Sequence, residues 1–216
     1  MNITILSSAF LREKKESTTI TLLSLARELM RRRHLVVIIT ERKKGYAAFE
    51  EIDGVPIYRL FSGRLLAHPR GLKAVQKKLG IKFDVIHGFS AAPALALRTL
   101  LARKISAPAA GTIHTLKSYP KGFGGFASFL NRVDAVTVPT NVMKEKLVAR
   151  GRRAEKIHVL HSFIDTRQFV PRDKNSLQKK YRFLGKKVVL YYGSLVESKG
   201  VRFLLQAFSS VLSACP

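Results

Sequence analysis

A glycine-bounded loop with a single lysine is the segment of this sequence best suited to chemistry. Residues 193–200 join an apolar run to the start of an expected helix, and they include Gly193, Ser194 and Lys199. The backbone N–H groups and the dipole at a helix N-terminus attract an anion, and the lysine adds a mobile positive charge. The loop therefore predicts a binding site for a phosphate or diphosphate. The alternative is an ordinary strand-to-helix turn with a surface lysine.

Other candidate side chains lie near the ends of apolar runs elsewhere in the chain. His87 and His114 each close such a run, and Ser17 and Thr18 stand where the first long helix is expected to begin. A histidine binds or moves a proton near neutral pH, and hydroxyl groups at a helix start can donate hydrogen bonds to a substrate. We interpret His87 as a structural residue that closes a buried strand. For His114 the residues alone leave a structural role and a site role open.

Several common active-site motifs are missing from the sequence. No G-x-G-x-x-G follows the first expected strand, which argues against a dinucleotide-dependent dehydrogenase, and no P-loop or G-x-S-x-G motif occurs. No spacing of histidine, aspartate and glutamate indicates a metal site, so no metal is expected. Cys215 is the only cysteine, which excludes a disulfide framework.

The elements that must position these residues alternate along the chain. Helical periodicity predicts five helices, the fourth with Thr140 as its N-cap and Gly151 as its stop. The alternation predicts an α/β fold, a Rossmann-like parallel sheet with helices on both faces, which binds ligands at the carboxyl ends of its strands. The expected strands are residues 3–6, 35–40, 55–60, 83–87, 108–114, 134–138, 156–160 and 187–192, and the expected helices are 19–32, 71–79, 93–103, 140–150 and 201–212.

A change of pattern after residue 161 predicts a domain boundary. Residues 162–185 break the alternation, and a new strand and helix follow them. We expect a first domain over residues 1–165, an interdomain linker over 166–185 and the start of a second Rossmann-like domain over 186–216. Because a single strand and helix cannot cover both faces of the strand, we expect this second domain to be truncated.

The chain is strongly basic. It has 39 Lys and Arg against 14 Asp and Glu, a formal charge of +25, and residues 54–133 hold 13 basic residues and one acid. Such a field attracts nucleic acid, anionic lipid or phosphorylated small molecules. No nucleic-acid recognition module is found, so no specific nucleic-acid partner is expected. The apolar fraction of 46% excludes disorder. The longest interior stretch without a charged residue, 85–97, is shorter than the roughly 18 residues of a membrane span.

The order of several short motifs resembles that of the retaining family-4 glycosyltransferases of GT-B fold, over most of the chain. The motifs are Asp-Val-Ile-His at 84–87, Thr-Ile-His at 112–114, Asp-Ala-Val at 134–136 before Leu147 to Gly151, Lys-Ile-His-Val-Leu at 156–160 before Ile164-Asp165, and Tyr-Tyr-Gly-Ser-Leu at 191–195 before Lys199-Gly200.

The resemblance implies transfer of a sugar from a nucleotide-diphosphate sugar to an acceptor with retention of configuration. The acceptor, lipid-linked or glycan, binds mainly to the first domain and the donor mainly to the second. No cofactor besides the donor substrate is implied. His114 corresponds to the family's catalytic histidine beside the transferred sugar. Gly193, Ser194 and Lys199 correspond to its donor-phosphate loop, and Ser17 and Thr18 lie in its substrate loop.

The chain departs from the family pattern at four points, one of which is His161-Ser162-Phe163 in place of the family's Pro-Asn-Gly. The loop after the first strand lacks the family's Gly-Gly pair, Ser194 stands where the family has an arginine, and the E-x₇-E motif of the donor domain is absent. We therefore expect these 216 residues alone to be inactive in sugar transfer. Two other functions stay open: a non-catalytic basic binding module derived from this fold, and a nucleotide-sugar epimerase of GT-B fold.

A basic helix raises the question of a membrane surface. Residues 70–82 carry five basic side chains around an apolar stripe of Leu72, Val75 and Leu79. Such a helix can lie on anionic lipid, so we expect the membrane surface as a further partner. In the alternative, the stripe faces the sheet and the lysines are solvated. Because no signal peptide is found, we expect a cytoplasmic protein, peripheral on the inner membrane face.

Overall fold

The computed structural model describes residues 1–7, 17–42, 44–60, 67–89, 106–114, 131, 133–167 and 169–214. These residues belong to two compact units, Met1–Thr166 and Arg167–Pro216, and each is described by itself. The helix expected at residues 93–103 lies outside the described residues, as do the side chains of residues 17–18 and 67–70.

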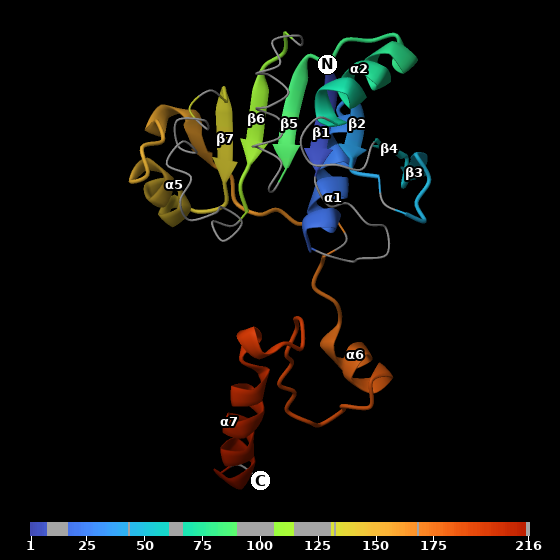
Figure 1. Ribbon diagram of the computed structural model, residues 1–216. Coiled ribbons are helices and arrows are strands. Elements are labelled where there is room, and N and C mark those ends of the chain that lie inside the picture. Colours follow the sequence, from blue (N-terminus) through green and yellow to red (C-terminus); the bar gives the residue numbers. More distant parts are fainter. Residues whose placement is uncertain are drawn as a thin grey trace. The chain divides into compact units, whose positions relative to one another are not determined.

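The first unit is built on an eight-stranded sheet with the order β3-β4-β2-β1-β5-β6-β7-β8 (Figure 1). Every neighbouring pair is parallel except β3 and β4. The predicted α/β fold with a parallel sheet is therefore confirmed. Its strands are β1 (Asn2–Ser7), β2 (Leu35–Thr40), β3 (Phe49–Ile52), β4 (Val55–Arg59), β5 (Val85–Phe89), β6 (Ala109–Thr112), β7 (Ala135–Val138) and β8 (Ile157–Val159).

The sequence did not predict β3, which pairs with β4 through a two-residue turn. Asp53 and Gly54 form this turn with φ values of 51° and 80°. Such a turn favours a glycine, and aspartate is one of the few other residues that tolerates the left-handed region. The hairpin adds an antiparallel edge to an otherwise parallel sheet.

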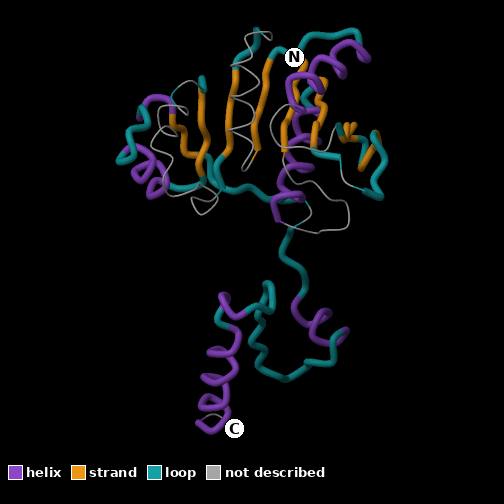
Figure 2. Tube along the Cα trace, in the orientation of Figure 1, coloured by secondary structure: helices purple, strands orange, loops and turns teal. Residues whose placement is uncertain are grey.

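Helices cover both faces of the sheet, as predicted. Along β2, Val36 and Ile38 pack in one core with residues of α1 (Ser17–Arg31), while Val37 and Ile39 pack in another with residues of α2 (Ala67–Leu79). Because successive side chains of a strand point to opposite faces, α1 and α2 lie on opposite sides of the sheet. Figure 2 shows the helices in purple beside the orange strands.

A third core lies under α5 (Asn141–Val148), between β6, β7 and β8. The Thr140 side chain caps this helix by accepting a hydrogen bond from the Met143 N–H at 3.2 Å. Gly151, with φ of 80°, donates its N–H to the Val148 carbonyl and ends the turn beyond the helix. The N-cap was predicted from the residue types, but the helix ends at Val148 with Ala149 as its C-cap, before the predicted end at Arg150.

The second unit contains α6 (Lys174–Lys180), the 3₁₀ turn η3 (Glu197–Lys199) and α7 (Val201–Ala214). The strand expected at residues 187–192 was wrong, because the described part of this unit offers no neighbouring strand for pairing. Most side chains of residues 187–192 are exposed to solvent, with Leu190 82% and Tyr192 97% exposed. Among the described residues of both units, no helix is long and apolar enough to cross a bilayer.

Candidate active site

One row of residues lines the carboxyl edge of the sheet in the first unit. Ser7 of β1 is in register with Thr40 of β2 on one side and with Phe89 of β5 on the other. Thr40 is in turn in register with Arg59, and Phe89 with Thr112. The carboxyl edge is where parallel α/β sheets bind ligands, and here it is mostly polar.

His114 lies two residues beyond β6, at this edge. Its ring packs against Phe89 at an interplanar angle of 59°, with 4.7 Å between the ring centroids. The Nε2 atom is shielded from solvent and has no hydrogen-bond partner among the described residues. Burial lowers the pKa of His114, so its imidazole is neutral at neutral pH. The arrangement leaves one ring nitrogen able to hydrogen-bond a bound molecule.

His87 lies inside β5 rather than at its end, because the strand continues to Phe89. Its Nε2 is 2.8 Å from the Thr112 hydroxyl, which is 2.7 Å from the Thr137 hydroxyl. Burial, with a smaller effect from His114, lowers the pKa of His87 to about 4. His87 is therefore a neutral residue that links three strands.

Arg59 ends β4 and is only 1% exposed. Its Nη2 forms an ion pair with Glu50 of β3, and its guanidinium carbon lies 5.0 Å from the centre of the Tyr46 ring. The sequence placed Arg59 in the expected strand 55–60 and among the basic residues of 54–133, but it did not predict that the side chain is buried. A charged residue directly after the apolar run 55–58 was the signal that it lies at the carboxyl edge.

Ser17 and Thr18 are the first two residues of α1, so the backbone places them where the sequence predicted. Their side chains lie outside the described residues. The crossover from β1 through α1 to the parallel strand β2 brings the start of α1 to the carboxyl edge of the sheet. These two residues and His114 therefore lie at one edge of the same sheet.

The remaining predicted residues belong to the second unit. The Ser194 carbonyl accepts hydrogen bonds from the Tyr191 hydroxyl at 2.9 Å and from the Val196 N–H at 3.0 Å. Lys199 ends the turn η3, and Gly200, with φ of 69°, leads into α7. The predicted loop therefore does precede a helix of 14 residues, and its side chains are exposed. The binding of a phosphate by this loop stays a prediction.

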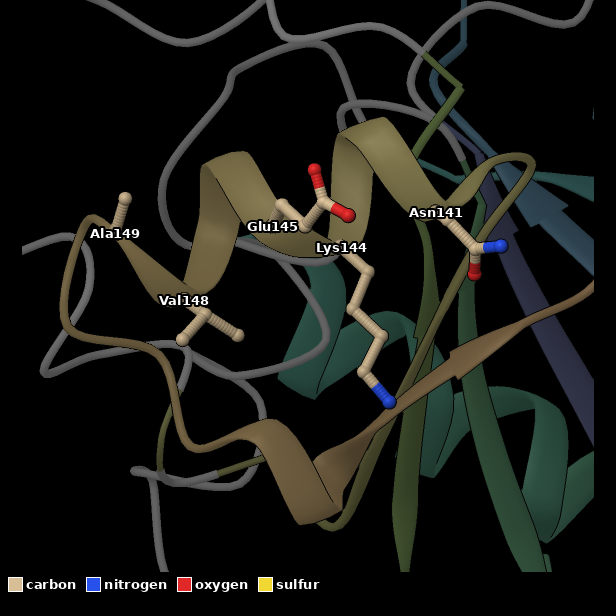
Figure 3. A pocket seen from close by; sticks show the side chains of 5 residues that line it. All are labelled: Asn141, Lys144, Glu145, Val148 and Ala149. Carbon is tan, nitrogen blue, oxygen red and sulfur yellow. The ribbon is translucent and has the colours of Figure 1, made fainter.

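A shallow pocket lies beside α5 (Figure 3). Its volume is about 580 Å³, and its described lining residues come from this helix and the residue after it: Asn141, Lys144, Glu145, Val148 and Ala149. None of these described lining residues is a predicted site residue. Within the described ranges, no group of three or more histidine, cysteine, aspartate or glutamate side chains is arranged to hold a metal ion.

The family model for Glycosyltransferase Family 4 matches residues 18–168. This match covers well over half of the chain and includes both the carboxyl edge of the sheet and His114. The chain belongs to Glycosyltransferase Family 4. The match begins at Thr18, leaves Ser17 just outside, and ends before the loop with Gly193, Ser194 and Lys199. Among curated proteins, none matches this family-4 chain.

Solved glycosyltransferase structures share the fold of this family-4 chain. HepE of Anabaena, in complex with UDP and glucose, aligns with a TM-score of 0.68 at 17% identity, covering 100% of this chain and 58% of HepE. The catalytic domain of starch synthase IV of Arabidopsis thaliana, bound to ADP and acarbose, aligns at 0.62 and 15%, covering 98% and 66%. Sucrose-phosphate synthase of Thermosynechococcus elongatus aligns at 0.56 and 14%, covering 85% and 98%. The shared architecture is the GT-B fold.

Proposed function

We propose that this chain is part of a glycosyltransferase that moves a sugar from a nucleotide-diphosphate sugar to an acceptor with retention of configuration. The observation that carries the proposal is the family-4 match over residues 18–168. The similar structure of HepE was solved with UDP-glucose, which supports a donor of this class. In the proposal, residues 1–165 receive the acceptor, residues 166–185 are the linker, and residues 186–216 begin the donor domain.

The chemistry of the proposal depends on stabilising the negative charge of the departing diphosphate. Cationic groups and backbone N–H groups fixed before the reaction stabilise such a charge. Lys199 supplies a cation, and the loop at Gly193 and Ser194 supplies N–H groups before the start of α7. No cofactor beyond the donor substrate is part of the proposal.

His114 binds the transferred sugar in this proposal. Its lowered pKa keeps the ring neutral, so it acts by hydrogen bonding rather than as a cation. The unpaired Nε2, which is shielded from solvent without substrate, would hydrogen-bond a sugar hydroxyl in this proposal. Ser17 and Thr18, in the first turn of α1, would contact the substrates from the same edge of the sheet.

The proposal is tested by donor binding and transfer with UDP-glucose as the first probe. The assay uses the 216-residue chain and, where the coding region continues in frame past Pro216, the longer product. In the active protein, Lys199→Ala should lower kcat about 10²–10³-fold, as the loss of one group that stabilises transition-state charge does. The exposed Lys187→Ala is the matched control and should leave kcat unchanged.

The outcomes separate the three functions. Transfer to an acceptor with the α-configuration of the donor retained, read by NMR of the product, supports the proposal. Epimerisation of the nucleotide sugar without an acceptor would support an epimerase instead. Failure of the longest product to bind any nucleotide sugar would leave the basic binding module. We expect no turnover from the 216 residues alone, because the described part of the second unit has no strand to form a donor domain.

We further propose a lipid-linked or glycan acceptor and a peripheral location on the inner, cytoplasmic membrane face. Leu72 and Val75 are buried against the sheet, whereas Leu79, the third residue of the stripe, is 36% exposed, so most of the apolar stripe of α2 does not reach lipid. The helix carries the exposed basic residues Lys73 and Lys77, and the segment after it carries the exposed Lys82. Membrane binding would thus be electrostatic, at about 1 kcal/mol per basic residue near an anionic surface. Co-sedimentation with phosphatidylserine vesicles should be strong at low salt and lost at high salt, and no binding at low salt would contradict the proposal.

A further inference from the structure

Three buried polar side chains at the carboxyl edge contain atoms without hydrogen-bond partners. They are Thr19 of α1, Thr40 of β2 and Arg59 of β4, which are 6%, 2% and 1% exposed. Within the described residues, the hydroxyl oxygens of both threonines and the Nε and Nη1 atoms of Arg59 are unpaired and shielded from solvent. A buried polar group left without a partner costs about 1–3 kcal/mol, more when it is charged. These unpaired atoms therefore lower the stability of the folded chain when no ligand is bound.

The fold brings these three residues to the same edge and the same face of the sheet. Thr40 and Arg59 are in register on adjacent strands. Each lies two residues after a core residue packed with α1, Ile38 and Ile57 respectively, so both belong to the sheet face that α1 covers. Thr19 lies in the first turn of α1, at the same carboxyl edge, and three residues before Leu22 of that core.

The charges at this edge favour an anion. Glu50 pairs with only one nitrogen of Arg59, and the arginine has no acceptor atoms of its own. The first turn of α1 contains no acidic residue, so the partial positive charge of the helix start is not offset there. Arg152, the other buried arginine among the described residues, has only its Nε unpaired, since its Nη1 and Nη2 donate to Asn131 and Val133.

We propose that Arg59, Thr40 and Thr19 form a binding site for a phosphate group carried by the acceptor. The donors come from two strands and a helix, an arrangement that suits the several oxygens of a tetrahedral oxyanion. That the anion belongs to the acceptor rests on the proposed function, whereas the anion site itself does not. Because the unpaired atoms are shielded from solvent, the anion reaches them only when this edge opens locally, so binding is measured at equilibrium.

The test uses inorganic phosphate and the 216-residue chain. Phosphate replaces chloride at constant ionic strength, and the midpoint of thermal unfolding is followed as a function of phosphate concentration. Wild-type chain should be stabilised in a saturable manner. Thr40→Val should weaken phosphate binding by about tenfold, the effect of losing one hydrogen bond to a charged group. Arg59→Lys keeps the positive charge for Glu50 but loses the planar guanidinium, and should weaken binding at least as much.

Thr4→Val is the matched control. The Thr4 hydroxyl is also buried and unpaired. Thr4 lies on the opposite face of the sheet, because Leu6, two residues further along the same strand, packs in the core with α2. This variant should bind phosphate as wild type does. Equal weakening in both threonine variants would overturn the proposal, because it would mean a general effect on stability. The absence of saturable stabilisation in wild type would also overturn it, and would leave ordered water as the partner of these atoms.

A second arm separates this site from the proposed function. Glucose 6-phosphate is compared with glucose and with inorganic phosphate in the same titration. Tighter binding of the phosphorylated sugar than of either part supports a phosphorylated acceptor. Binding of inorganic phosphate without sugar transfer by any product of the gene would retain the anion site and reject the glycosyltransferase. Transfer to unphosphorylated acceptors with no phosphate binding would retain the glycosyltransferase and reject the site.

Discussion

The Asp84 carboxylate accepts a hydrogen bond from the backbone N–H of Asn2 at 2.7 Å, 82 residues away in sequence. Asp134 repeats this relationship two strands further along the sheet, where its carboxylate accepts from the Ala109 N–H at 2.8 Å. Each aspartate directly precedes a strand and holds the first residues of the neighbouring strand. Both belong to motifs on which the family resemblance rests, and both lie at the amino edge, away from the site. Their role here is structural.

Removal of these carboxylates should therefore destabilise the first unit. We expect Asp134→Ala to lower the free energy of unfolding by about 1.5–3 kcal/mol, and Asp84→Ala by less because its bond is more exposed. Urea unfolding followed by circular dichroism measures both. Glu51→Ala, at an exposed position of β3, is the control and should change the free energy little. Loss of stability in the control but not in the aspartate variants would contradict this role.

His87 should make stability depend on pH. Its pKa is lowered to about 4 in the folded chain, while an unfolded histidine has a pKa near 6.5. The unfolded state thus binds more protons between these values, and the free energy of unfolding should fall as the pH drops from about 6.5 to 4. The full contribution of His87 to the free energy of unfolding is present above pH 6.5.

His87→Gln is the variant that tests this dependence. Glutamine can still hydrogen-bond the Thr112 hydroxyl but does not titrate, so the loss of stability between pH 6.5 and 4.5 should be smaller than in wild type. His158→Gln, at an exposed position of β8, is the control. Urea midpoints at several pH values give the comparison, and identical slopes in wild type and His87→Gln would refute the prediction.

The turn between β3 and β4 should be sensitive at Gly54. Its φ of 80° lies in the left-handed region, where a Cβ atom is unfavourable, although there is open space around the position. Gly54→Ala should therefore cost about 1 kcal/mol through the backbone alone. Asp53→Asn is the control, because asparagine also tolerates the φ of 51° found there. Denaturant unfolding of the two variants distinguishes a conformational cost from a general sensitivity of the turn.

The two units should differ in amide hydrogen exchange. The amides of β1 are paired on both sides in the sheet, whereas those of residues 187–192 belong to no strand. We expect the former to exchange orders of magnitude more slowly. Mass spectrometry of peptic fragments measures both at once. Slow exchange over residues 187–192 would show that this segment is paired in solution, for example with a second copy of the chain.

Most of the first unit could be predicted because all of its described strands except β3 are short apolar runs. The strand β3 could not be found this way, since Phe49-Glu50-Glu51-Ile52 is half charged. The turn residues Asp53 and Gly54 were the available signal. The prediction of a strand at residues 187–192 was wrong for the opposite reason. This run is apolar, but an apolar run becomes a strand only where a neighbouring strand supplies hydrogen bonds.

The site could be predicted only in part. His114 and the start of α1 lie at the carboxyl edge because chain order and parallel pairing determine that edge. The burial of Arg59 could not be predicted, because its ion pair comes from Glu50 on the strand that was missed. The role of Lys199 could not be predicted from its loop alone, because an ordinary strand-to-helix turn with a surface lysine has the same residue types.

The central position of β1 has a consequence for synthesis on the ribosome. One neighbour, β2, follows within a few dozen residues, but the other, β5, ends only at Phe89. The nascent chain can therefore form the β3-β4-β2-β1 half first, while the second edge of β1 stays unpaired until β5 has emerged. During that interval the backbone N–H and C=O groups along this edge of β1 are open to pairing with other nascent chains, and pauses in translation between residues 60 and 89 should promote aggregation.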